Sequence, residues 1–478
     1  MRSFAAILRI AGSGLVLALC AFAGCKKTVN QSQPSLLNTV RVSLSSTNSE
    51  GNLDAINDSI GVSNDGRFIA FTSKATNLVP GDTNNAADVF LRDNVSRTLV
   101  LVSTSLIGGP ANGASGSPSL SGDGRYVAFS SFATNLTVDA VPAGKKQIFV
   151  RDIALGVTTL VSRASGITGL IGDEDSSVPR ISNDGVFIIF QSSSNLLDGV
   201  PAGGDDNDSG PLASDIYRRK VIDGTSAFPT DLVSMVSLAA PGSGPANKGN
   251  SLSTNPCISG DGRFVAFTSA ATNLVSASQD GGPDTNGVDD VFVRDCDTFR
   301  TVRCSVEYAG SNPTLKGLSR SPAITLDGQL VAFSSLAGNL NPTAQEQTPN
   351  IYIRSWNGLA PFTDVLSVHT SGATGGASCD KPTISGDGSR IAWQSASSAL
   401  VNGDSNGVED VFLRNRISFQ TSRESVQTFG GQLDGQSSVP SYSPDGRYIV
   451  FWSKSTNVVD DDTNGAADIF LRGPPITR

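Results

Sequence analysis

The distribution of apolar and polar residues along the chain is dominated by one unit that recurs seven times. In its clearest copy, Pro118 to Leu136, an alternating stretch leads into an Asp-Gly pair, and the run RYVAFSS follows. Alternation with a period of two predicts a half-buried β-strand, and an Asp-Gly pair between two such runs predicts a tight turn. Each unit is therefore predicted to begin with a β-hairpin.

Each repeat also contains two further strands. After the hairpin and a polar loop comes a third run such as Asp88 to Asp93, followed by a short turn and a fourth run such as Thr98 to Ser103. Four antiparallel strands repeated seven times are typical of a β-propeller. We therefore predict an all-β, seven-bladed propeller. Its seven Asp-Gly turns begin at Asp65, Asp123, Asp184, Asp261, Asp327, Asp387 and Asp445.

The two ends of the repeat region complement each other. The seventh repeat stops after its third run, Asp468 to Gly473, whereas Asn38 to Ser46 precedes the first hairpin and is similar to the fourth runs of other repeats. An N-terminal strand that completes the last blade would close the ring and leave no unpaired edge there. The propeller is therefore predicted to span residues 38–478.

The N-terminus has the features of a targeting segment. Arg2 and Arg9 flank the start of an apolar stretch that ends at FAGC, Phe22 to Cys25, and this sequence resembles the lipobox of bacterial lipoproteins. The resemblance implies a signal peptide over residues 1–24, lipidation of Cys25, and a flexible tether over residues 25–37. By the same resemblance, Lys26 favours the outer membrane in a cell that has one. The alternative is an ordinary signal peptide with an incidental cysteine.

Charge narrows the choice of partners. The formal net charge is −9, and it becomes −11 once the signal peptide is removed with its two arginines. Binding to phosphate backbones requires clustered Lys and Arg, so nucleic acid is excluded as a partner. We expect a monomer that contacts the membrane only through its N-terminal lipid and that binds an envelope protein or glycan.

The motif SxDGRxhAFxS (where h is apolar), followed by a strand of the IFVRD type, resembles the TolB-type, WD40-like propeller repeat. The resemblance covers about residues 38 to 473 and implies the fold, but propellers of this type serve several functions. The chain departs from TolB itself because it lacks the N-terminal α/β domain and has seven repeats rather than six.

An arginine recurs near the end of the third run of each repeat. We interpret these arginines as structural partners of the Asp in the Asp-Gly turns, within or between blades. The alternative is a ring of arginines that binds a substrate. The seven residues are taken as Arg92, Arg151, Arg218, Arg294, Arg354, Arg414 and Arg472.

Four repeats share DxNxxxD immediately before the third run. Closely spaced carboxylate and amide oxygens are suitable ligands for Ca²⁺, and the second and fifth repeats lack the pattern. The sequence therefore suggests an optional Ca²⁺ site, and the alternative is an Asx turn. The candidate ligands are Asp82, Asn84, Asp88, Asp284, Asn286, Asp290, Asp404, Asn406, Asp410, Asp462, Asn464 and Asp468.

Signatures of catalysis are weak, and we assign no catalytic residue. The single histidine, His369, excludes His-dependent triads and multi-His metal sites. Four cysteines beyond residue 25 allow three disulfide connectivities, but their spacing favours free thiols. We therefore predict a binding or scaffold module with its ligand on the face formed by the longer loops, such as Leu196 to Ser214. The alternative is an envelope enzyme that cleaves polysaccharide with carboxylates on that face.

Overall fold

The computed structural model describes residues 37–166, 169–198, 214–221, 229–238, 247–276, 282–306, 317–342, 348–358, 361–376 and 378–476. The predicted signal peptide and almost all of the predicted tether, including Cys25, lie outside these residues. The chain divides into Met1–Leu36 and Leu37–Arg478, and the description below concerns the second unit alone. In the described part of the chain, no helix is both long and apolar enough to cross a membrane.

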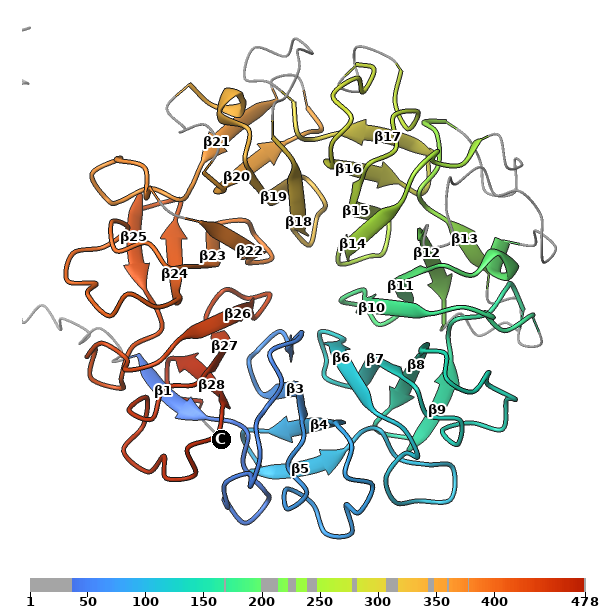
Figure 1. The fold of residues 1–478 in the computed structure, drawn as a ribbon, viewed down its shortest axis with the longest axis vertical. Helices are drawn as coiled ribbons and strands as arrows, with labels where there is room; N and C mark the ends of the chain where they lie inside the picture. The colour runs from blue at the N-terminus through green and yellow to red at the C-terminus, as the bar shows by residue number, and fades with distance from the viewer. Residues whose placement is uncertain are drawn as a thin grey trace, which may run out of the picture. The chain divides into compact units, whose positions relative to one another are not determined.

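Seven four-stranded antiparallel sheets form a ring in this unit, as predicted (Figure 1). Within each blade the strands are ordered from the centre of the ring to its rim. The first strand of the repeat is innermost and the fourth is outermost. In chain order the blades are β2 Gly61–Val62, β3 Phe68–Ser73, β4 Asp88–Asp93 and β5 Thr98–Leu101; β6 Ser115–Leu120, β7 Tyr126–Ser131, β8 Gln147–Asp152 and β9 Val157–Leu160; β10 Ser176–Ile181, β11 Phe187–Ser192, β12 Asp215–Lys220 and β13 Thr230–Leu232; β14 Ser253–Ile258, β15 Phe264–Ser269, β16 Asp290–Asp295 and β17 Arg300–Arg303; β18 Ser319–Ile324, β19 Leu330–Ser335, β20 Asn350–Ser355 and β21 Phe362–Val365; β22 Cys379–Ile384, β23 Arg390–Ser395, β24 Asp410–Asn415 and β25 Gln420–Arg423; β26 Ser437–Tyr442, β27 Ile449–Ser453 and β28 Asp468–Gly473.

The seventh blade is completed by the N-terminal strand β1, Asn38–Arg41, and this confirms the predicted closure. β1 pairs antiparallel with β28, with Asn38 opposite Gly473 and Arg41 opposite Phe470. In Figure 1 the blue N-terminal strand lies beside the red C-terminal strands. This backbone pairing covers the edge of β28, which would otherwise be unpaired.

Each blade has the same aromatic centre, because the second and third strands each place one aromatic side chain at the same level. Phe71 stacks on Phe90 with ring centroids 5.8 Å apart, and both rings are fully buried. The stacked pairs of the other six blades are Phe129–Phe149, Phe190–Tyr217, Phe267–Phe292, Phe333–Tyr352, Trp393–Phe412 and Phe451–Phe470. Stacking of large rings between paired strands stabilises each sheet beyond the burial of area alone.

The Asp-Gly turns are closed by local hydrogen bonds. Asp65 Oδ1 accepts from the Ser63 hydroxyl at 2.8 Å and from the Arg67 backbone N–H at 3.0 Å. The same two bonds recur at Asp123, Asp184, Asp261, Asp327, Asp387 and Asp445. The glycine that follows has a positive φ, and at Gly124 a Cβ would also come within 2.3 Å of the Phe68 ring in the preceding blade. Glycine is therefore required here by both the turn and the packing of neighbouring blades.

The recurrent arginines have different partners from those predicted. In six repeats the arginine faces a threonine on the fourth strand and donates to its hydroxyl, so the pairing with the turn aspartates is wrong. The pairs are Arg151–Thr158, Arg219–Thr230, Arg294–Thr301, Arg354–Thr363, Arg414–Thr421 and Arg472–Thr39. In the first blade Leu99 takes the place of the threonine, and Arg92 donates to the carbonyls of Leu44 and Ser45 at 3.0 and 2.8 Å. The Oδ1 atom of each turn aspartate instead accepts from the hydroxyl and the N–H group of its own turn, as at Asp65.

In the third repeat the recurrent arginine is Arg219, and the assignment to Arg218 is wrong by one position. Arg219 lies opposite Ile188, as Arg92 lies opposite Ile69, and donates to the carbonyls of Arg163 and Ala164. Successive residues of a strand point to opposite faces. Arg218 therefore faces the other side, where it pairs with Asp231 at 2.9 Å.

Candidate functional site

The first strands of the seven blades line a channel along the axis of the ring, with a volume of about 490 Å³. This size lies within the range of ligand pockets, about 300 to 1,000 Å³. The channel walls are built from the residues on either side of a proline that recurs in six of the first strands. These prolines are Pro118, Pro179, Pro256, Pro322, Pro382 and Pro440.

A β-bulge interrupts each of these six strands beside its proline. In the second blade the register breaks between Gly116 and Ser119, and Ser117 has a φ of +55°. Proline has no N–H to donate to the ladder, and a bulge accommodates it. The corresponding residues Val178, Asn255, Ser321, Lys381 and Val439 have φ values between +50° and +55°. A left-handed conformation costs about 1 to 3 kcal/mol at a non-glycine residue, so the repeat maintains a ring of strained backbone around the channel.

Side chains of the preceding blade hold several bulges in place. The Ser117 backbone N–H donates to Asp58 Oδ2 at 2.6 Å, and the Asn255 and Val439 N–H groups donate to Gln191 Oε1 and Gln394 Oε1, each at 3.1 Å. These bonds connect neighbouring blades at the channel wall. The sequence revealed the recurring proline but not the bulge, because in these three strands the acceptor of the bulge N–H comes from another repeat.

Charged groups of both signs line the channel. Asp58 is the single carboxylate among the described residues of the lining, and Arg180 and Lys381 supply positive charge. Burial raises the pKa of Asp58 to about 6, against the opposing effects of hydrogen bonds from Ser117 and Thr72 and of the charge on Arg180. The channel therefore offers a polar ligand hydrogen-bonding groups, both signs of charge and a carboxyl group that titrates near neutrality.

The DxNxxxD loops bring their three polar side chains together. In the first repeat Asn84 Oδ1 accepts from the Ala86 N–H at 2.8 Å, and Asn84 Nδ2 donates to Asp88 Oδ2 at 2.7 Å. Asn286, Asn406 and Asn464 make the same two contacts in their loops. Each asparagine thus forms an Asx turn, as in the alternative interpretation, and its polar atoms are already used.

In three of these four loops an arginine from the fourth strand lies between the two aspartates. Arg303 Nη1 is 3.3 Å from Asp284 and 3.6 Å from Asp290, and Arg423 Nη1 is 3.1 Å from Asp404 and 3.6 Å from Asp410. In the closing blade, Nη1 of Arg41 lies 3.3 Å from Asp462 Oδ1 and 3.2 Å from Asp468 Oδ2. This arginine was missed in the sequence, although the fourth-strand runs NTVRVS, RTVRCS and QTSRES each carry it.

The first repeat has Leu101 at the position of this arginine, opposite Phe90 in the strand register. Burial, together with the smaller effect of the nearby negative charge of Asp82, raises the pKa of Asp88 to about 6. The described residues contain no group of three or more His, Cys, Asp or Glu side chains that could surround a metal ion. A metal in any of these loops would therefore rely on two protein carboxylates and on water.

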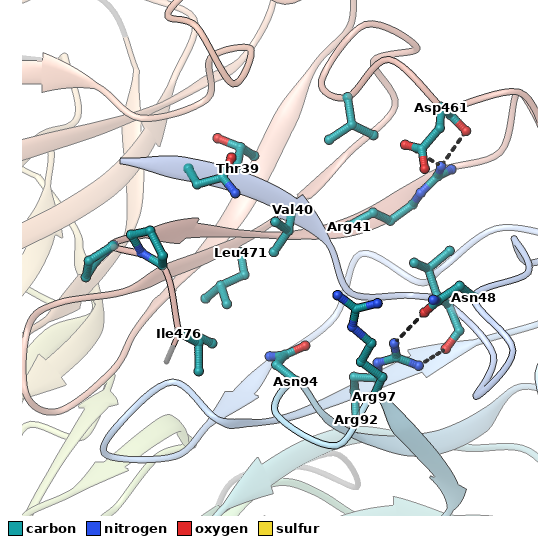
Figure 2. Close-up of a pocket in the computed structure, with 16 residues that line it drawn as sticks. Thr39, Val40, Arg41, Asn48, Arg92, Asn94, Arg97, Asp461, Leu471 and Ile476 are labelled. Atoms are coloured by element: carbon teal, nitrogen blue, oxygen red, sulfur yellow. Dashed lines mark hydrogen bonds and ion pairs between the residues drawn. The ribbon is translucent and has the colours of Figure 1, made fainter. Parts of the chain in front are cut away.

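A second cavity, of about 480 Å³, lies where the closing strand meets the first blade (Figure 2). Arg41 reaches from β1 to Asp461, and Arg92 reaches from the first blade to the Asn48 side chain at 3.0 Å. Arg41, which lines this cavity, therefore connects the N-terminal strand to the C-terminal part of the chain.

The remaining predicted residues have structural surroundings. His369 is half-buried and its Nδ1 lies 2.9 Å from the Ser371 hydroxyl. Cys257, Cys296, Cys304 and Cys379 are free thiols, as predicted. Burial raises the pKa of Cys304 to about 12, which suppresses the reactive thiolate. Most of the loop from Leu196 to Ser214, which was predicted to lie on the binding face, is outside the described residues.

No family model matches the sequence, and no curated protein is significantly similar to it. Among solved structures the chain is similar to an oligogalacturonate lyase in complex with manganese, with 11% identity, a TM-score of 0.48 and coverage of 92% of both chains. It is also similar to an oligogalacturonate lyase from Vibrio parahaemolyticus (12%, 0.48, 92% of this chain and 97% of that one) and to TolB from Acinetobacter baumannii (15%, 0.36, 87% and 78%). At these levels of identity the similarity concerns the propeller fold alone.

Proposed function

We propose that this protein is a lipid-anchored binding or scaffold module of the cell envelope, without catalytic activity, that receives a protein or glycan ligand at the central channel and the longer loops around it. The observation that supports this proposal is the channel wall, in which bulged backbone, hydroxyl and amide groups and charges of both signs face one space of about 490 Å³.

The wall is suited to binding because it is rigid before a ligand arrives. Each bulge lies within a four-stranded sheet, and three of them donate a backbone N–H to a side chain of the neighbouring blade: Asp58, Gln191 or Gln394. A site that needs no ordering loses less entropy when it binds.

The alternative function, cleavage of polysaccharide, requires two carboxylates about 5 to 10 Å apart. Among the described residues that line the channel, Asp58 is the single carboxylate, and Arg180 and Lys381 carry positive charge. Recognition of a charged or hydroxyl-rich ligand fits this arrangement better than paired-acid chemistry does.

We also propose that a lipid on Cys25 anchors the protein to the outer membrane. Lipidation of Cys25, with the tether up to residue 37, would hold the propeller close to the outer membrane, on its periplasmic or surface side. The net charge of the chain is −9. Because a negative protein is repelled by the phosphates of nucleic acid, envelope proteins and glycans are the better candidates as partners.

Capture of ligands from solubilised envelope, with the full chain as bait, tests the proposal. Ala323 lies beside Pro322 and lines the channel, so Ala323→Trp should fill part of the space and remove most of the capture. Val157, on the rim strand β9, is 53% exposed, and Val157→Trp should bind as the unsubstituted chain does. Circular dichroism and melting temperature confirm that both variants are folded. If folded Ala323→Trp captures the same proteins and glycans in the same amounts, the channel is not the ligand site.

A further inference from the structure

The four DxNxxxD repeats differ at one position, and this difference points to a cation site. They share the two aspartates, the asparagine and a fourth-strand serine that donates to the second aspartate; in the first repeat Ser103 donates to Asp88 at 2.6 Å. Three of the repeats add an arginine two residues before this serine, and the first repeat has Leu101 there. The sheet geometry is otherwise the same.

The arginine acts as a built-in cation in the three repeats that have it. Its Nη1 lies between the two carboxylates at 3.1 to 3.6 Å, and the arginine side chains are 1 to 10% exposed. One positive charge thus offsets two buried negative charges at the same place in three blades. Buried carboxylates without such a partner are costly.

The first repeat contains the same carboxylates but no arginine. Asp88 is fully buried, Asp82 is 8% exposed, and Asp82 Oδ1 has no hydrogen-bond partner. Among the described residues, no Lys, Arg or His forms an ion pair with either aspartate. The side chain of Leu101 packs instead on the apolar cluster between the first and seventh blades.

We propose that the first repeat binds a free divalent metal cation, Ca²⁺, between Asp82 and Asp88, at the place that an arginine guanidinium occupies in the fourth, sixth and seventh repeats. The metal supplies from solution the positive charge that the other three blades supply from the chain. This site is separate from the central channel and does not depend on the function proposed for it.

The ligand chemistry favours a hard divalent ion. Both protein ligands are carboxylate oxygens with a combined charge of −2, and Ca²⁺ takes oxygen ligands and completes its shell with water. Asn84 is excluded as a ligand because its oxygen accepts from Ala86 and its nitrogen donates to Asp88 and Ala111. With two protein ligands the dissociation constant should resemble that of extracellular modules, about 10⁻⁴ to 10⁻³ M.

The test measures Ca²⁺ bound to the chelator-treated full chain by equilibrium dialysis at millimolar Ca²⁺, with the melting temperature followed in parallel. The unsubstituted chain should bind one ion more than Asp82→Asn. Leu101→Arg restores the arginine of the other repeats and should also remove this ion. Leu101→Met keeps an apolar side chain of similar size and should retain the ion.

A gain of function provides the complementary test. Arg423→Leu gives the sixth repeat the composition of the first, so this variant should bind one ion more than the unsubstituted chain. Equal binding by the unsubstituted chain and folded Asp82→Asn would overturn the proposal, and so would no binding up to about 10 mM, well above the expected dissociation constant. If Leu101→Arg does not fold, the comparison of Asp82→Asn with Arg423→Leu still decides between these outcomes.

Discussion

Replacement of Arg41 by methionine should destabilise the closed ring strongly, because this arginine is the charge partner of several acids where the chain ends meet. Its guanidinium lies 2.5 Å from Glu50, 3.3 Å from Asp462 and 3.2 Å from Asp468. The side chains of Arg41, Asp462 and Asp468 are only 1 to 3% exposed. Methionine keeps the length of the side chain and removes its charge, so two buried carboxylates remain without a cation.

Removing one partner of a buried ion pair costs about 3 to 5 kcal/mol. The unfolding entropy of a domain of about 440 residues is about 0.9 kcal/mol per kelvin when scaled from the average per residue. The loss therefore corresponds to a fall in melting temperature of about 3 to 5 °C. Scanning calorimetry in the presence of a chelator measures it without interference from Ca²⁺.

A matched control is available in the same blade. Arg447 pairs with Asp445 at 2.6 Å, but its side chain is 56% exposed, so Arg447→Met should cost at most about 1 kcal/mol. Adding Asp462→Asn and Asp468→Asn to Arg41→Met should recover part of the loss, since no uncompensated charge then remains. Equal melting temperatures for Arg41→Met and Arg447→Met would refute the reasoning.

Four further predictions concern other parts of the chain. Deletion of Asn38–Arg41 exposes the edge of β28, so the product should aggregate in size-exclusion chromatography; a monomer as stable as the full chain would contradict this. Cys25→Ser should move the folded protein from the membrane to the soluble fraction, and unchanged membrane association without an acyl group at Cys25 would contradict the anchor. Because the pKa of Asp58 is raised from 3.8 to about 6, its ionisation costs stability as pH rises from about 4 to about 6. The free energy of unfolding of Asp58→Asn, measured with denaturant, should not show this decrease between about pH 4 and about pH 6. The same dependence on pH in the variant and in the unsubstituted chain would contradict the prediction. Iodoacetamide should label the buried Cys304 and Cys379 only after unfolding, as peptide mass spectrometry can show, and rapid labelling of the native protein would argue against their burial.

The sequence alone determined the architecture because the features that specify it are local. The Ser-x-Asp-Gly turn closes through bonds within five residues, and the alternation of apolar residues defines each strand. Seven copies of one hairpin therefore fixed the number of blades, and the missing fourth run of the last repeat predicted that β1 pairs with β28. The stacked aromatic pairs follow from the same repeat.

The partners of polar side chains were decided only by the tertiary structure, because they come from other strands. The recurrent arginine was assigned to the turn aspartates, and a fourth-strand threonine accepts its hydrogen bond instead. In the third repeat two arginines are adjacent, and the sequence does not show which of them is equivalent to the recurrent arginine. Arg218 was therefore predicted, whereas the strand pairing identifies Arg219. A shift of one residue in a strand reverses the face to which a side chain points.

The DxNxxxD loops show the same division. The sequence predicted from their spacing that two carboxylates and an amide lie close together, and the structure brings them together. Whether a guanidinium joins them depends on a residue of the fourth strand, which in the closing blade comes from the other end of the chain, and only pairing of the third and fourth strands places it there. Three bulges of the channel likewise have acceptors in the preceding blade. Local turns and periodicity thus specify the blades, whereas the register between strands and the contact between blades determine which charges meet.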